Sequence, residues 1–144
     1  MLSNTCKYGL RAVIYLALNA GKGEKIGIKK IASDLQVPSP FLGKILQSLA
    51  RHKVLDSTKG PNGGFGLGKN PAEIFLMDIV GIIDGDDNFR RCAIGNMLCE
   101  EQEQPCALHS RYAVLRDEMK SLFEASTVAE VIEEAGEGGS GFRI

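Results

Sequence analysis

Long apolar segments are missing from the beginning of this sequence. The longest early apolar run, residues 12–18, is seven residues long and follows the charged Lys7 and Arg11 in an amphipathic helical pattern. A membrane-spanning helix needs about 20 predominantly apolar residues. We therefore expect no signal peptide, no membrane association and a cytoplasmic location. In a reducing cytoplasm, the four cysteines are expected to act as ligands or sensors rather than as structural disulfides.

Residue groupings typical of an active site are also missing. No paired carboxylates and no triad spacing converge in the sequence, and the adjacent His109 and Ser110 are too close in sequence to face one substrate. We therefore expect that the protein is not an enzyme. With 144 residues, of which 44% are hydrophobic and 24% charged, the chain is long enough for one globular domain and one appendage.

Acidic residues are scarce in the first half of the chain. Residues 1–69 contain 11 Lys and Arg against 3 Asp and Glu, whereas residues 70–144 contain 6 against 15, although the net charge of the whole chain is only -1. A basic half is the electrostatic pattern expected of nucleic-acid binding, although any anionic partner would fit it. The two halves are therefore expected to have different partners.

Three helices are predicted in the basic half. Ser3 or Asn4 can cap a helix that runs to about residue 20, residues 28–36 form a short second helix, and Ser39 with Pro40 opens a third that ends near residue 52. The apolar stripe of the third helix comprises Phe41, Leu42, Ile45, Leu46 and Leu49. Its opposite stripe comprises Gly43, Lys44, Gln47, Ser48 and Arg51, none of them acidic. Two short helices joined by a tight turn predict a helix-turn-helix whose second helix enters the major groove of DNA.

A β-hairpin is predicted directly after the third helix. Residues 54–58 and 65–67 alternate as strands, and the turn between them is rich in Gly. Such a hairpin is a wing, which could bring Lys59 and Asn62 to the DNA backbone or minor groove. The segment also has the spacing of a phosphate-binding loop, but Asn70 replaces the magnesium-binding Ser or Thr, and we reject that interpretation.

Three of the four cysteines fall close together. Cys92, Cys99 and Cys106 are separated by six residues each, and His109 follows three places later. Pro105 favours a helix start, which would place Cys106 in a first turn where the macrodipole lowers a thiol pKa. Zinc ligands are usually paired at shorter intervals, so the spacing favours an iron–sulfur cluster, in which a His can replace a Cys. Reduced thiols or one regulatory disulfide remain the simpler alternative.

The last part of the chain predicts a dimerisation element. An apolar stripe with little of its own chain left to cover it comprises Leu108, Tyr112, Leu115, Met119, Leu122 and Phe123. Ser126 is expected to cap a final helix over residues 127–135, and a flexible tail follows from Gly136.

The run VPSPFLGKILQSLARHKVLDSTKGPNGGFGLGKNP, followed by LMDIVGIIDG, the cysteine trio and ALHSRYAVLRDEMKSLFEASTVAEVIEE, resembles a known family. It is similar to the bacterial winged-helix transcription regulators of the iron–sulfur sensing type, the IscR/NsrR-like family. The resemblance implies a homodimer formed by a long helix over residues 105–123, and a cluster whose state changes DNA affinity. It also implies Cys92, Cys99, Cys106 and His109 as the cluster ligands. The chain departs from the family pattern at Lys7, Gly43 and Lys59, and in its equal cysteine intervals.

Together these observations predict a mainly α protein, a winged helix-turn-helix with a small β-hairpin wing and a long C-terminal dimerisation helix. The expected parts are a DNA-binding domain over residues 1–84, a cysteine-containing cluster loop over residues 85–104, the dimerisation and last helices over residues 105–135, and a tail over residues 136–144. The expected DNA contacts are Ser39, Lys44, Gln47, Ser48, Arg51, Lys59 and Asn62.

The function expected from these parts is that of a homodimeric transcriptional regulator. It would act as a repressor on double-stranded operator DNA, with its affinity set by an iron–sulfur cluster of the 2Fe-2S rather than the 4Fe-4S type. One alternative is a regulator of the same fold that works by thiol oxidation or zinc binding. Another is an electron carrier or enzyme that uses the cluster.

Overall fold

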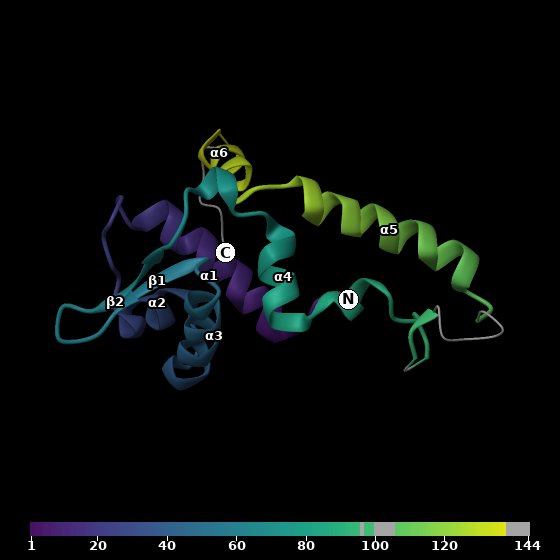
Figure 1. Cartoon of the computed structure of the whole chain (residues 1–144), viewed down its shortest axis with the longest axis horizontal. Coiled ribbons are helices and arrows are strands. Elements are labelled where there is room, and N and C mark those ends of the chain that lie inside the picture. The colour runs from purple at the N-terminus through teal and green to yellow at the C-terminus, as the bar shows by residue number, and fades with distance from the viewer. Residues whose placement is uncertain (96, 100–105, 138–144) are drawn as a thin grey trace.

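The computed structural model describes residues 1–95, 97–99 and 106–137, and it is mainly helical with one two-stranded hairpin (Figure 1). In chain order the elements are α1 (Asn4–Asn19), α2 (Ile28–Leu35), α3 (Ser39–Arg51), β1 (Leu55–Thr58), β2 (Gly64–Leu67), η1 (Pro71–Glu73), α4 (Leu76–Asp84), η2 (Asp86–Phe89), α5 (His109–Ala125) and α6 (Val128–Glu137). The predicted fold class is confirmed. Residues 96 and 100–104 of the expected cluster loop, the expected helix start at Pro105, and residues 138–144 of the expected tail lie outside the described residues.

The first three helices enclose the main core. Leu16 of α1, Ile31 of α2 and Leu46 of α3 are each fully buried there. Burial of one such side chain contributes about 1.5–3 kcal/mol. Phe41, at the edge of the predicted stripe, is 40% exposed, and its ring packs at a right angle to that of Tyr8, with centroids 5.8 Å apart.

Local signals explain how α1, α2 and α3 begin and end. Ser3 caps α1 by accepting a 2.9 Å hydrogen bond from the Cys6 amide, as predicted. Gln36 ends α2 in the left-handed conformation, with φ 55°, and so turns the chain toward α3. Ser39 is the first residue of α3, so the N-cap position belongs to Pro38 and not to Ser39.

The wing is joined to the segment before α2. Strands β1 and β2 pair antiparallel from Leu55 opposite Leu67 to Thr58 opposite Gly64. Ile26 adds a bridge to Phe65, with N···O distances of 2.9 Å in both directions. A Cβ at Gly66 would lie 2.4 Å from the Glu24 carbonyl oxygen, so only glycine allows this close approach. The hairpin is therefore held in place along its second strand.

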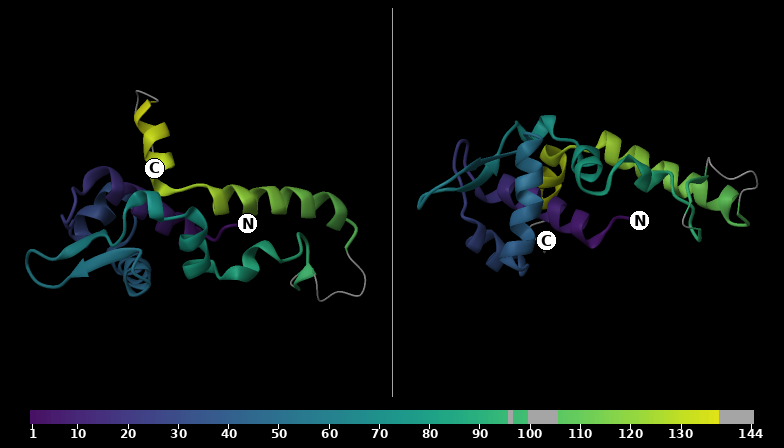
Figure 2. Two further views of the ribbon diagram at one scale, coloured as in Figure 1. Left: turned by 45° about the horizontal axis from the view of Figure 1, so that its top comes forward. Right: turned by 60° about the horizontal axis from the view of Figure 1, so that its bottom comes forward.

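The two last helices differ in how they pack. Helix α6 is capped by Thr127, not by Ser126 as expected, because Thr127 and Glu130 exchange hydrogen bonds between their side chains and backbone amides in a capping box. Val128 then enters the main core, fully buried. Figure 2 shows α5 extending away from the winged part, while α6 returns over α1.

The predicted stripe on α5 is divided into a packed edge and an exposed edge. Met119 and Phe123 pack on a second core cluster formed by Cys6, Val80 and Phe89. Along the adjacent edge of the same stripe, Leu108, Leu115 and Leu122 are exposed, at 43%, 64% and 60%. Within the described part of the chain, this second set is the part of the stripe that lacks cover. None of the described helices is long and apolar enough to cross a lipid bilayer.

Candidate nucleic-acid interface and cysteine site

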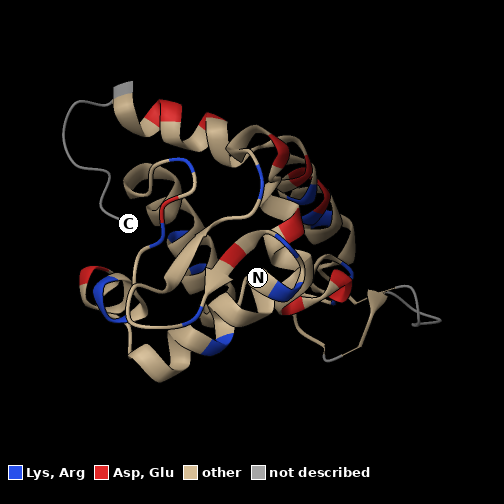
Figure 3. Cartoon of the chain, turned by 60° about the vertical axis from the view of Figure 1, so that its left-hand side comes forward, with Lys and Arg blue, Asp and Glu red and all other residues tan. Residues whose placement is uncertain are grey.

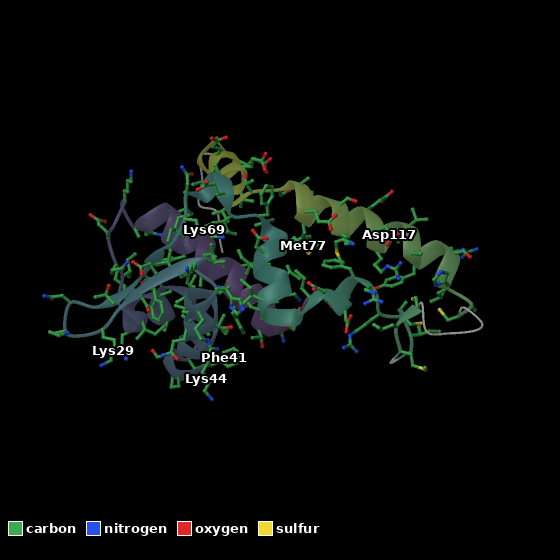
Figure 4. All side chains as sticks on the ribbon, viewed as in Figure 1. Lys29, Phe41, Lys44, Lys69, Met77 and Asp117 are labelled. Carbon is green, nitrogen blue, oxygen red and sulfur yellow. The ribbon has the colours of Figure 1, made fainter. Side chains whose placement is uncertain are left out.

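The polar stripe of α3 lies on the outside of the winged part. Lys44, Gln47 and Arg51 are exposed, and Ser39 and Ser48 are half-buried. Figure 4 shows Lys44 projecting from α3 on the same side of the molecule as Lys29 and Phe41. In the described part of the chain, no acidic side chain forms an ion pair with Lys44 or Arg51. This face therefore combines hydrogen-bond donors with uncompensated positive charge.

A groove of about 900 Å³ runs between α3 and the wing. Three of the predicted DNA contacts, Gln47, Arg51 and Lys59, line it. The remaining wing residue, Asn62, is exposed outside the groove lining. The described residues that line the groove include no Asp or Glu. The groove thus offers amide and cationic groups from two elements to one anionic ligand.

The start of α2 also borders this groove and was missed from the sequence. Gly27 precedes α2 and gives it no side-chain cap, and Lys29 lines the groove. Its neighbour Lys30 is paired with Asp34 at 3.0 Å, whereas Lys29 has no such partner among the described residues. An uncapped helix N-terminus attracts phosphate through its free amides. The tandem Lys29-Lys30 was the only sequence signal for this contribution.

Charge is divided between the two parts of the molecule. In Figure 3, positions of acidic residues form red bands along α6 and α5, while positions of Lys and Arg are distributed over the winged part. The groove lies at one end of the molecule, and the N-terminal end of α5, where the cysteine segment lies, is at the other (Figures 1 and 2). Helices α4 and α5 lie between the two sites and contact each other.

The three predicted cysteine ligands lie near one another, and all four cysteines of the chain are free thiols. Backbone hydrogen bonds fold the segment back on itself: the Cys92 amide donates to Met97 O at 3.1 Å, and the Cys99 amide donates to Arg90 O at 2.9 Å. Cys92 is buried, and Cys99 and Cys106 are half-buried. The thiols of Cys99 and Cys106 both interact with that of Cys92.

The thiols do not share the same pKa direction. The amide of Ile94, then the thiol of Cys106, lower the pKa of Cys92 by hydrogen bonds to its sulfur. The hydrogen bond between these two thiols raises the pKa of Cys106, and it is the largest cause of that shift. The prediction of a lowered pKa at Cys106 was wrong, because α5 begins only at His109 and Cys106 precedes it. The carbonyl oxygen of Cys106 accepts a 2.9 Å hydrogen bond from the His109 amide.

Arg116 of α5 is a further member of the site that the sequence did not reveal. Its side chain is only 12% exposed, and its guanidinium interacts with the Cys99 thiol. Its Nη1 is buried without a hydrogen-bond partner in the part of the chain that the structure describes. A buried cationic donor without an acceptor indicates that a negatively charged group belongs beside it.

The profile of the Rrf2 family, described as iron-dependent transcriptional regulators, matches residues 2–134. The chain belongs to the Rrf2 family. A helix-turn-helix transcriptional regulator of Aquifex aeolicus is 32% identical over 133 residues, which cover 92% of this chain and 91% of that protein.

Two solved structures share the Rrf2 fold of this chain. CymR, the global cysteine regulator of B. subtilis, matches with a TM-score of 0.73 and 25% identity, over 93% of this chain and 97% of CymR. T. potens IscR also matches with a TM-score of 0.73, at 20% identity, over 98% of this chain and 92% of IscR. The winged-helix resemblance is confirmed, and the chain is a helix-turn-helix transcriptional regulator of the Rrf2 family.

The cysteine site of this Rrf2 chain is only partly assembled. Across residues 1–95, 97–99 and 106–137, no three His, Cys, Asp and Glu side chains are grouped so as to hold a single metal ion. His109 is half-buried at the start of α5, and its ring makes no hydrogen bond to another described residue. Zinc requires all its ligands around one point, whereas a cluster of several irons accepts more widely spread thiolates. The structure thus brings three thiols into mutual contact and places His109 at the start of the helix that follows them.

Proposed function

We propose that this Rrf2 regulator is a repressor that binds a double-stranded operator through α3, the wing and the start of α2. The groove carries the proposal. Lys29, Arg51 and Lys59 come from three separate elements and line the same groove, so their positive charges could all bind one anionic ligand. Ser39, Lys44, Gln47 and Ser48 would face the major groove, and Asn62 would contact the backbone from the wing. In this assignment the residues of the groove bind phosphates and those of α3 read bases.

Salt dependence tests this interface. An operator selected from random duplexes would be titrated at several salt concentrations with the wild type and with Lys29→Ala, Lys59→Ala and Lys69→Ala variants. Loss of one phosphate contact lowers the salt slope by about 1. We expect this for Lys29→Ala and Lys59→Ala but not for Lys69→Ala, since Lys69 lies away from Lys29 and Lys44 in Figure 4. A salt slope unchanged by all three substitutions would reject the groove as the DNA site.

We further propose that Cys92, Cys99, Cys106 and His109 hold an iron–sulfur cluster of the 2Fe-2S type. Two observations support the fit: the mutual interactions of the three thiols, and the buried Arg116 Nη1 that has no acceptor among the described residues. The thiolates would bind iron, and His109 would complete the ligand set from α5. When bound, the cluster would supply a redox-sensitive group. The family description as iron-dependent regulators agrees with this assignment.

A second candidate is regulation by the thiols themselves, or by zinc. The neighbour CymR is described as a global cysteine regulator, and the interacting thiols of Cys92 and Cys106 could form a disulfide on oxidation. The ultraviolet–visible spectrum of protein purified without oxygen separates the two candidates. A cluster gives a brown protein that Cys92→Ala, Cys99→Ala or Cys106→Ala bleaches and Cys6→Ala does not. A colourless protein with one zinc, or with neither metal, would favour the second candidate.

We also propose that the protein acts as a homodimer through the uncovered face of α5. Leu108, Leu115 and Leu122 recur every seventh residue and are all exposed. Such a seam is typical of helices that pair with a second helix. Two copies would present two winged parts to half-sites about one helical turn, roughly 10 base pairs, apart.

A further inference from the structure

Arg116 occupies an electrostatically incomplete position. Its side chain is 12% exposed, and Nε donates to Asp117 Oδ1 at 3.1 Å. Asp117 is itself 65% exposed, so water screens much of its negative charge. The guanidinium carries a full positive charge at every relevant pH, and Nη1 is buried with no acceptor among the described residues. The exposed Asp117 carboxylate alone therefore does not neutralise the charge of the Arg116 guanidinium.

The cysteine segment meets that guanidinium through Cys99. The Cys99 thiol interacts with Arg116, and Cys99 interacts in turn with Cys92. A neutral thiol is a poor acceptor, whereas a metal-bound thiolate is negatively charged and accepts strongly. The missing negative charge is therefore one that metal loading would supply.

We propose that Arg116 is the counter-ion of the metal-loaded cysteine site, donating from its guanidinium to the Cys99 sulfur and to the cluster that the thiolates hold. This inference rests on the cluster assignment made under Proposed function. Arg116 is not a ligand; it is a positioning residue that neutralises charge and fixes the segment against α5.

The role has a measurable consequence for the cluster. One-electron reduction adds a negative charge to the site, and a nearby buried cation stabilises the reduced form more than the oxidised one. Removing the cation should lower the midpoint potential. Residues that support metal ligands typically change metal affinity by about 10–100-fold when they are replaced.

The experiment compares anaerobically purified wild type with Arg116→Gln, Arg116→Met and Lys120→Gln variants. Lys120 is the matched control, because it lies one turn further along α5 in an exposed 3.6 Å pair with Glu124. Iron and sulfide content, midpoint potential from a dye-mediated titration, and the rate of iron release to a chelator would be measured for each protein. Thermal unfolding of the demetallated forms would be recorded alongside.

Both Arg116 variants should show a lower midpoint potential and release iron about 10–100-fold faster, while Lys120→Gln matches the wild type. Demetallated Arg116→Met should be at least as stable as the demetallated wild type, because a buried guanidinium that is balanced only by the exposed Asp117 carboxylate has been replaced by an apolar group. Arg116→Met therefore decides the question if Arg116→Gln fails to fold. Wild-type potential and release rate in Arg116→Met would show that Arg116 only fills space, and would overturn the inference. A wild type without iron and sulfide would reject the cluster assignment, and this inference with it.

Discussion

The Tyr15 hydroxyl of α1 donates a 2.5 Å hydrogen bond to Asp34 Oδ2 of α2, and Lys30 donates to the same oxygen at 3.0 Å. Burial, then the bond to Asp34, raise the pKa of Tyr15 to about 12. The bond from Tyr15, then that from Lys30, lower the pKa of Asp34. The first helix of the helix-turn-helix is thus attached to α1 through two groups that titrate far from neutrality.

The stability of the helix-turn-helix should therefore fall at both ends of the pH range. Asp34, with its lowered folded-state pKa, stabilises the protein above its unfolded pKa of 3.8, and this contribution is lost as the pH falls through the folded value. Tyr15, with its raised pKa, stabilises the protein below 10, and that contribution is lost as the pH rises toward 12. In the Tyr15→Phe variant, the free energy of unfolding measured with urea should change less with pH at both ends of the range. An unchanged profile would mean that the bond has no energetic role.

Replacing Gly43 by Ala should separate stability from DNA binding. An added Cβ would meet nothing within 4 Å, so no neighbour in the described chain requires glycine at this position of α3. Alanine should stabilise the helix by about 0.5–1 kcal/mol. It should weaken operator binding, because Gly43 lies on the outer face between the proposed base contacts. Gly136→Ala in α6 is the control, since its Cβ is equally unobstructed. Calorimetry and operator titration of both variants would check this, and a Gly43→Ala protein with full affinity would contradict it.

A charge placed in the leucine seam of α5 should disrupt the dimer. Leu115→Glu would put a carboxylate at a position that is 64% exposed in one chain but would be buried between two. We expect sedimentation to show monomers and the operator titration to lose its tight binding phase. Ser121→Glu adds the same charge on an exposed position away from the seam and should leave both unchanged. If Leu115→Glu still sediments as a dimer, another surface forms the contact.

Loading of the cysteine site and operator binding should be reciprocally coupled. The cysteine segment leads into α5, and α5 packs on α4 of the winged part through Met119 and Phe123. If loading changes operator affinity, bound operator must change cluster affinity by the same factor, typically about 5–150-fold. Operator titrations of loaded protein, demetallated protein and Cys92→Ala at one salt concentration measure the factor. Equal affinities for all three, with all three dimeric, would remove any regulatory role from the site.

Those parts of the fold that depend on nearby residues could be predicted from the sequence. Ser3, Pro40 and the Gly-rich turn of the wing are local signals, and the structure has helices and strands where they indicate them. The start of α5 could not be predicted in this way, because Cys106 and His109 carry no strong capping signal. Helical periodicity placed Phe41 on the apolar stripe of α3, but it could not give the burial of this side chain, which lies 40% exposed beside Tyr8.

The functional sites depend more on tertiary structure. Lys29 reaches the groove because the wing is folded against the start of α2, which no spacing along the chain indicates. Arg116 looks like an ordinary surface residue of a charged helix until the cysteine segment covers it. The ligand roles of Cys92, Cys99, Cys106 and His109 stay predictions until the spectrum is measured.

The bridge between Ile26 and Phe65 fastens the wing to the segment that leads into α2. A hinged wing could follow a duplex of any shape, whereas one fastened along its second strand holds its tip at a set height above α3. In the proposed complex, the connection over residues 20–27 would act as a spacer, because it holds the wing at a set distance from α3. Duplexes that already curve to that span would bind with little deformation, and stiff straight ones would have to be bent. Part of the choice of operator would thus reside in a loop that touches no base.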